Sequence, residues 1–272
     1  MTDNINIELN LLLDAVYQKY GYDFRDYSKA HVKRRILHRI KIAGYNNISE
    51  LIPRILYDQK FFHVLLGDLS INVTEMFRDP HFYIAIKQHI IPILKTYPFI
   101  KIWHAGCSTG EEVYSMAILF KEEGIYDRTQ IYATDFNSKV LKIAKEGIYK
   151  QELIEDYSKN YNKAGGSASF SDYFSSKYES AIISRSLKEN IVFSDHNLVT
   201  DQVFGEMNMI VCRNTMIYFT KKLQNRVVDL FYNSLIPGGI LCLGTKESLR
   251  FSSQQDNFDE ITIKEKIYKK KY

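Results

Sequence analysis

The chain has 272 residues, of which 45% are hydrophobic and 25% charged, so it has the composition of a folded globular protein and not of a disordered or low-complexity chain. This length suits one large domain or two modest ones. The 36 Lys and Arg residues against 32 Asp and Glu leave a net charge of only +4, which is too small to predict nucleic-acid binding by itself.

The first 70 or so residues indicate helices separated by turns at 22–28 and 45–49, without strand alternation. In the helix expected over 29–43, a spacing of about 100° per residue predicts one apolar stripe. This stripe consists of Val32, Ile36, Ile40 and Ala43.

The same helix is strongly basic. Three basic residues lie opposite the apolar stripe and two more lie along one flank, and no acid within the segment balances them by local pairing. Such a surface suits an anionic partner, although a solvated charged face is the common alternative. The candidate docking residues are Arg34, Arg35, His38, Arg39 and Lys41.

From residue 100 onward, short apolar runs alternate with longer helical segments, which predicts a parallel sheet with crossover helices. Between Gly147 and Asn190 this rhythm gives way to a polar, aromatic segment, which predicts an inserted subdomain with short antiparallel strands. The alternation from Phe258 to Tyr268 predicts an antiparallel edge strand. The fold class is therefore α/β, with helices in front of it.

An apolar strand ending near Ala105 runs into the glycine-bounded loop 106–110 and then into a helix that opens with Glu111 and Glu112. Two carboxylates at this point would repel a pyrophosphate but would suit the ammonium group of S-adenosylmethionine. The next strand ends at Asp135, an acid that can accept both ribose hydroxyls. These features favour S-adenosylmethionine over a dinucleotide. The alternative is that the acids only complement helix ends.

Over nearly its whole length the sequence resembles the chemotaxis receptor glutamate methyltransferases, the CheR family. The motifs that carry the resemblance occur in the family's order, and the last is the most specific. They are the basic stretch 27–42, NVTEMFR at 72–78, the loop at 103–117, ATD at 133–135, NL at 197–198 and CRNTMIYF at 212–219.

The resemblance implies a Rossmann-like class-I methyltransferase domain over 100–272 with a small antiparallel β-subdomain inserted at 149–190. It also implies an N-terminal helical substrate-docking domain over 1–75 and a linker over 76–99. Carried over by position, the cofactor-binding residues are Asn72, Thr74, Arg78, Glu112, Asp135, Asn197, Leu198, Arg213 and Asn214.

The implied reaction is methyl esterification of glutamates on the cytoplasmic helices of chemoreceptors, with S-adenosylhomocysteine as product and no metal. Because a glutamate is already an anion at neutral pH, no general base is required. Tyr218 and Arg78 are the catalytic candidates, and they would orient the substrate carboxylate. In the family the inserted subdomain can add a receptor tail as an extra strand; here residues 173–184 could provide the edge.

His104 departs from the family pattern, which has a small residue there. A general base is one interpretation, but on a strand we expect a buried, neutral, hydrogen-bonded side chain. Val113 and the Phe136-Asn137 pair are further departures, and none removes a proposed ligand.

Three cysteines without CxxC spacing predict neither disulfides nor a zinc site, and the start of the chain shows no signal peptide. We therefore expect a cytoplasmic monomer that neither enters the membrane nor binds nucleic acid. The alternatives are a class-I methyltransferase acting on RNA or another protein, and a catalytically silent signalling scaffold of the same fold.

Overall fold

A computed structural model describes residues 4–70 and 72–272, which form two compact units. The smaller unit contains the N-terminal helices and residues 218–226, and the larger contains residues 72–217 and 227–272. The boundary after residue 71 falls close to the predicted end of the helical domain at residue 75. The N-terminal helices are α1 (Asn4–Tyr20), α2 (Lys29–Ala43), α3 (Leu51–Tyr57) and α4 (Gln59–Leu69).

The four N-terminal helices confirm the helical prediction, with turns where the sequence places them. Each is amphipathic. In α2 the residues Val32, Ile36 and Ile40 are buried as predicted, and they belong to the core of this unit. Ala43, the predicted fourth member of the stripe, is exposed, because it is the last residue of the helix before the left-handed Gly44.

The larger unit is built on a seven-stranded sheet in the order β6-β2-β1-β7-β8-β10-β9. Five neighbouring strands are parallel, whereas β10 is antiparallel to β8 and β9 to β10. The strands are β1 (Ile100–Ala105), β2 (Thr129–Asp135), β6 (Ile191–Asp195), β7 (Met207–Cys212), β8 (Leu235–Leu243), β9 (Phe258–Thr262) and β10 (Ile267–Lys270).

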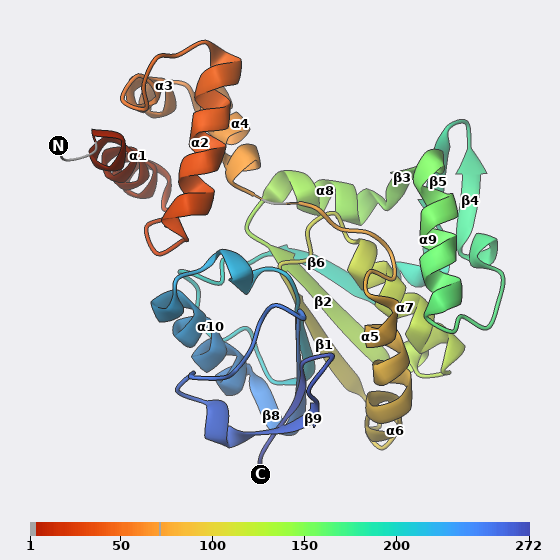
Figure 1. The fold of residues 1–272 in the computed structure, drawn as a ribbon. Coiled ribbons are helices and arrows are strands. Elements are labelled where there is room, and N and C mark those ends of the chain that lie inside the picture. The colour runs from red at the N-terminus through yellow and green to blue at the C-terminus, as the bar shows by residue number, and fades with distance from the viewer. Residues whose placement is uncertain (1–3, 71) are drawn as a thin grey trace. The chain divides into compact units, whose positions relative to one another are not determined.

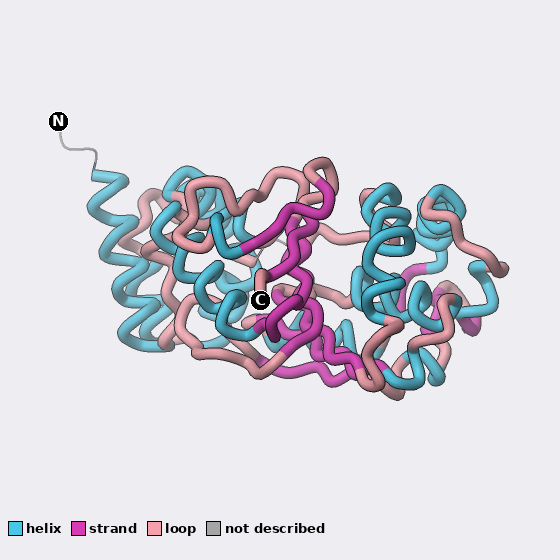
Figure 2. Tube along the Cα trace, turned by 90° about the horizontal axis from the view of Figure 1, so that it is seen from below, coloured by secondary structure: helices cyan, strands magenta, loops and turns pink. Residues whose placement is uncertain are grey.

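Helices cover both faces of this sheet, and Figure 2 shows its strands in magenta running between them. Helix α7 lies on one face and α10 on the other (Figure 1). On the α10 face, Phe231 packs edge-on against Trp103 of β1, with 5.5 Å between ring centroids. The helices are α5 (Pro80–Ala85), η1 (Ile86–Ile90), α6 (Ile91–Leu94), α7 (Glu111–Glu122), η2 (Tyr126–Arg128), α8 (Ser138–Glu146), α9 (Gln151–Lys163), η3 (Phe170–Tyr173), η4 (Arg185–Leu187), η5 (Met216–Tyr218), α10 (Lys221–Ser234) and η6 (Gln255–Asn257).

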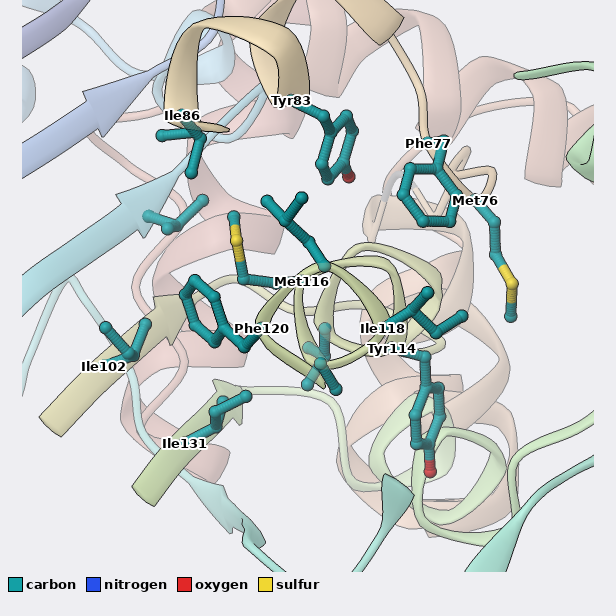
Figure 3. Close-up of a cluster of buried hydrophobic side chains, with 14 of the residues drawn as sticks. Met76, Phe77, Tyr83, Ile86, Ile102, Tyr114, Met116, Ile118, Phe120 and Ile131 are labelled. Atoms are coloured by element: carbon teal, nitrogen blue, oxygen red, sulfur yellow. The ribbon is translucent and has the colours of Figure 1, made fainter. Parts of the chain in front are cut away.

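The predicted linker over 76–99 is instead a packed part of the larger unit. It forms α5, η1 and α6, and Phe82, Tyr83 and Ile86 are fully buried in the main hydrophobic core. Figure 3 shows Tyr83 and Ile86 facing the side chains of α7. Pro80 and Pro92 lie in the first turns of α5 and α6, where proline is favoured.

The predicted inserted subdomain is present as a separate three-stranded antiparallel sheet in the order β3-β5-β4. Its strands are β3 (Ile148–Lys150), β5 (Ser180–Ile183) and β4 (Phe174–Lys177), and α9 lies between β3 and β4 in the chain. Glu122 at the end of α7 accepts hydrogen bonds from the hydroxyls of Tyr161 and Tyr173, which attaches the insert to the core.

The C-terminal alternation forms two strands instead of the single predicted edge strand. The antiparallel direction is confirmed, but β9 is the edge and β10 lies between β9 and β8. Residues 263–266 turn the chain back between them, with Lys266 in the left-handed region (φ 54°).

Candidate active site

Four parallel strands bring most of the predicted cofactor residues to one edge of the sheet. The register pairs Ala105 of β1 with Thr134 of β2, and Asp135 with Asp195 at the end of β6, while His104 pairs with Val211 of β7. The loops that follow these strands carry the glycines, Asn197 and Arg213. This is the edge where parallel α/β sheets bind ligands, because all the carboxyl ends meet there.

A cluster of charges around a buried arginine occupies this edge. Arg213 donates from Nη1 to Glu112 Oε2 and from Nη2 to Asp79 Oδ2, both at 2.7 Å. Only 1% of its side chain is exposed, and its guanidinium lies 4.0 Å from the ring centroid of Phe82. Two acids therefore share one arginine, so the cluster has a surplus of negative charge that suits a cationic ligand.

The ionisation of Glu112 depends on this arginine. Burial alone would raise the pKa of Glu112, but Arg213 and His104 together outweigh it and hold that pKa below its ordinary value. Burial likewise opposes the charge of Arg213, but Glu112, Tyr83 and Asp79 together reverse this effect and give a raised pKa. At neutral pH the two are an ion pair.

His104 lies beside the same carboxylate. It is 1% exposed, so the expected buried position is confirmed, and its Nδ1 lies 3.5 Å from Glu112 Oε1. Neither ring nitrogen meets hydrogen-bond geometry with a described residue, but Nδ1 faces the Glu112 carboxylate and helps to lower its pKa. Tyr83 Oη, Ser108 Oγ and Arg213 Nε are also buried without such a partner among the described residues.

Asp135 fastens the glycine loop to the second strand. Its Oδ2 accepts the backbone N–H of Ser108 and its Oδ1 that of Asn137, both at 3.0 Å. Burial raises the pKa of Asp135, and these backbone hydrogen bonds only partly offset the increase. Gly106 has a φ of +80° and leaves no room for a side chain, since a Cβ there would lie 2.6 Å from Thr215 Oγ1.

The remaining predicted ligands lie on loops of the same unit. Asn197 accepts the N–H of Val199 at its side-chain oxygen (3.0 Å), and Leu198 is buried. Asn214 is in the left-handed region with a φ of 60°. Asn72, Thr74 and Arg78 share one partly buried segment, in which Arg78 Nη1 donates to the carbonyl of Val73 at 3.0 Å.

Tyr218 and the basic helix belong to the smaller unit. The carbonyl of Tyr218 accepts the N–H of Ser28 at 2.8 Å, and its half-buried ring meets His31 edge-on at 5.2 Å between centroids. On α2, Arg34, His38 and Lys41 are exposed and Arg35 is half-buried.

Arg39 differs from the other docking candidates. It forms a two-pronged ion pair with Asp68 of α4, with Nη2 2.7 Å from Oδ1 and Nε also bound. From the sequence, only acids within the same helix were considered, and Asp68 is 29 residues away in the chain. We therefore remove Arg39 from the proposed docking surface, because its charge is already compensated inside the protein.

Two residues of the site were missed from the sequence. Asp79 directly follows the Arg78 motif residue, and this adjacency was its only signal. Glu247 lies beyond β8 and accepts four backbone N–H groups, from Asn214, Met216, Ile217 and Gly244. Nothing in the local sequence around Glu247 indicates this role.

Glu111, the first residue of α7, is buried and accepts the Thr109 hydroxyl at 2.6 Å. Burial raises its pKa to about 7. Because this folded-state pKa lies above the unfolded one, the protonated acid favours the folded state, and its contribution is lost as the pH rises towards and through about 7.

We expect Glu111→Gln to weaken this pH dependence, because glutamine keeps the acceptor for Thr109 but does not ionise. Between about pH 4 and pH 8, the free energy of unfolding of the wild type should therefore fall by about 3 kcal/mol more than that of the variant. Urea denaturation at both pH values measures the difference. Glu112→Gln is the control with the opposite sign, since the pKa of Glu112 is lowered. Parallel pH profiles of wild type and Glu111→Gln would contradict the assignment.

The residues at this edge fit S-adenosylmethionine. Its amino-acid part carries an ammonium and a carboxylate, and the cluster offers Glu112 and Asp79 beside Arg213. The buried polar atoms without partners, on His104, Tyr83, Ser108 and Arg213, are groups that a polar ligand would satisfy.

Residues 4–70 and 72–272 contain neither a membrane-spanning helix nor a metal-binding cluster. None of the helices there is long and apolar enough to cross a membrane. No group of three or more His, Cys, Asp or Glu side chains in this part of the chain could hold a metal ion.

Comparison with known proteins gives matches over both units. Residues 72–267 match the family described as "CheR methyltransferase, SAM binding domain", and residues 7–70 match "CheR methyltransferase, all-alpha domain". A Pseudomonas putida protein named "Putative methyltransferase Cher3" is 48% identical over 267 residues and 98% of both chains. The "Chemotaxis protein methyltransferase" of Borreliella burgdorferi is 30% identical over 91% of both chains. The Escherichia coli protein of the same name is 26% identical, over 86% of this chain and 81% of its own.

Proposed function

Since the chain belongs to the CheR methyltransferase family and is an S-adenosylmethionine-dependent methyltransferase, we propose that it esterifies glutamate side chains on the cytoplasmic helices of chemoreceptors. This reaction would tune chemotactic adaptation and leave S-adenosylhomocysteine as product. The chemotaxis methyltransferases among its relatives support the substrate class. The observation that carries the cofactor assignment is the cluster of Glu112 and Asp79 around the buried Arg213 at the carboxyl edge of the sheet.

In this proposal Glu112 holds the ammonium of the cofactor and Asp135 its ribose hydroxyls, while Asn197 bonds the adenine. The bound cofactor supplies an electrophilic methyl group on a sulfonium. The other proposed contacts are Asn72, Thr74, Arg78, Leu198, Arg213 and Asn214.

The chain then has to orient the attacking carboxylate and remove its water. A glutamate side chain in water has a pKa of about 4.3, so it is already ionised at neutral pH and needs no general base. Arg78 can form a charge-assisted pair with a carboxylate, and the Tyr218 hydroxyl can donate a hydrogen bond to it. Correct placement of the reacting atoms supplies the rate enhancement.

We propose that α2 binds the acidic receptor helices through Arg34, Arg35, His38 and Lys41. We expect Arg34→Glu with Lys41→Glu to lower the rate of receptor methylation roughly tenfold at low salt, with a smaller effect near 0.15 M salt, because exposed charges act mainly on association and are screened. The measurement is the initial rate at two salt concentrations.

Lys60→Glu, a single exposed reversal on α4, is the control for position and should leave the rate unchanged. Equal rates for the double variant and this control would contradict the docking role. The affinity for S-adenosylhomocysteine should stay the same in all three proteins.

A receptor tail is a further proposed partner. Strand β4 (Phe174–Lys177) is at the edge of the small sheet, so a peptide could add to it by β-augmentation. Titration with a receptor C-terminal peptide tests this, and absence of saturable binding would contradict it. We propose that the enzyme is a cytoplasmic monomer.

The class of substrate can be tested directly with methyl-labelled S-adenosylmethionine, receptor-containing membranes and RNA. A glutamate ester releases labelled methanol from the protein fraction in mild base. Label retained in RNA, or in protein after base treatment, would contradict the proposal and favour one of the other methyltransferase activities.

A further inference from the structure

Glu247 is a buried acid that accepts hydrogen bonds from four backbone N–H groups. It is 5% exposed, and its Oε2 accepts the N–H of Gly244 at 2.6 Å and of Asn214 at 3.0 Å. Its Oε1 accepts the N–H of Met216 at 2.7 Å and of Ile217 at 3.3 Å. Within residues 4–70 and 72–272 no cation forms an ion pair with it, so these N–H groups provide its stabilisation.

These hydrogen bonds join the loops that follow two neighbouring strands. Cys212, the last residue of β7, is paired with Leu243, the last residue of β8. The β7 loop starts at Arg213 and carries Asn214 in the left-handed region, and the β8 loop leads to Glu247. One carboxylate thus fixes the path of the chain through residues 214–217.

The same β7 loop forms part of the cofactor site. Arg213 binds Glu112, and the side chain of Thr215 lies so close to Gly106 that a Cβ there would be 2.6 Å from its hydroxyl oxygen. Gly244 is close to Asn214, because a Cβ on Gly244 would lie 2.8 Å from Asn214 N and 3.0 Å from its Nδ2. A shift of this loop would therefore move Asn214 relative to the glycine loop.

We propose that Glu247 is a positioning residue that holds Asn214 in place for cofactor binding. This inference rests on the proposed role of Asn214 as a cofactor contact. A carboxylate suits the position because it accepts hydrogen bonds on both oxygens and donates none. Glutamine is not equivalent, since its NH₂ group would face two of the four backbone N–H donors.

The test is a double-mutant cycle on cofactor affinity. The dissociation constant of S-adenosylhomocysteine is measured by calorimetry for wild type, Glu247→Gln, Asn214→Ala and the double variant. We expect each single variant to bind about tenfold or more weakly, and the double variant to bind little worse than either. Such non-additivity is expected if Glu247 acts through Asn214 and not if it only supports the fold.

Two further variants keep the test decisive. Gly244→Ala crowds the same loop without removing the carboxylate, and we expect it to weaken binding as well, even if Glu247→Gln fails to fold. Glu265→Gln changes another buried acid of the same unit, and it should leave the affinity unchanged.

The outcomes separate the two proposals. Unchanged affinity in Asn214→Ala would contradict the proposed cofactor role of Asn214, and the inference with it. A clear effect of Asn214→Ala combined with a strictly additive effect of Glu247→Gln, or with unchanged affinity in Glu247→Gln or Gly244→Ala, would overturn the positioning role alone.

Discussion

Replacing Arg213 by methionine is expected to destabilise the larger unit by about 3–5 kcal/mol and to abolish measurable cofactor binding. Methionine fills much of the same space but leaves the carboxylates of Glu112 and Asp79 without their shared partner. Breaking a buried ion pair on one side costs this much because the remaining charge is left in a poorly solvated place. The stability change is measured by urea denaturation, and binding by calorimetry with S-adenosylhomocysteine.

The control is a variant in which the two acids are neutralised together with the arginine. In the variant Asp79→Asn, Glu112→Gln, Arg213→Met both carboxylates that pair with the arginine are gone, so we expect stability close to that of the wild type but no recovery of cofactor binding. If the single variant Arg213→Met were as stable as the wild type, the proposed contribution of this cluster to stability would be contradicted. A triple variant less stable than the single one would also contradict it.

Tyr218→Phe is expected to lower kcat about 100-fold while leaving the affinity for S-adenosylmethionine unchanged. Phenylalanine keeps the ring contact with His31 and the backbone hydrogen bond to Ser28, so it removes only the hydroxyl. A misplaced attacking carboxylate can cost this factor without any change in cofactor binding. Single-turnover rates on a receptor fragment and a separate binding titration give the two values.

Tyr57→Phe is the matched control, because Tyr57 is 90% exposed and belongs to the same unit as Tyr218. It should behave as the wild type in both measurements. Parallel losses of kcat and cofactor affinity in Tyr218→Phe would contradict an orienting role and indicate a structural one.

Most of the fold was predictable because its elements have local signals. The apolar runs from residue 100 became the parallel strands, and the turn residues separated the N-terminal helices. The linker over 76–99 came from the family resemblance and not from a local signal, whereas Pro80 and Pro92 lie at the start of short helices whose apolar side chains enter the core.

The site was predictable where motifs are contiguous, as at residues 103–117 and 212–219. The partners of these residues were not, because they come from distant parts of the chain. Asp68 compensates Arg39 across 29 residues, and Asp79 reaches Arg213 across 134. Within the described part of the chain, Glu247 accepts its hydrogen bonds from backbone N–H groups, and such contacts leave no pattern in the side-chain sequence.

The most direct test of the central claim is tandem mass spectrometry of a receptor cytoplasmic fragment incubated with this enzyme and S-adenosylmethionine. We expect a mass increase of one methylene on glutamate side chains, lost after mild base, and strongly reduced with Tyr218→Phe. Methylation on any other residue type, or no base-labile methylation of the receptor by an enzyme that binds S-adenosylhomocysteine, would contradict the proposed glutamate methyltransferase activity.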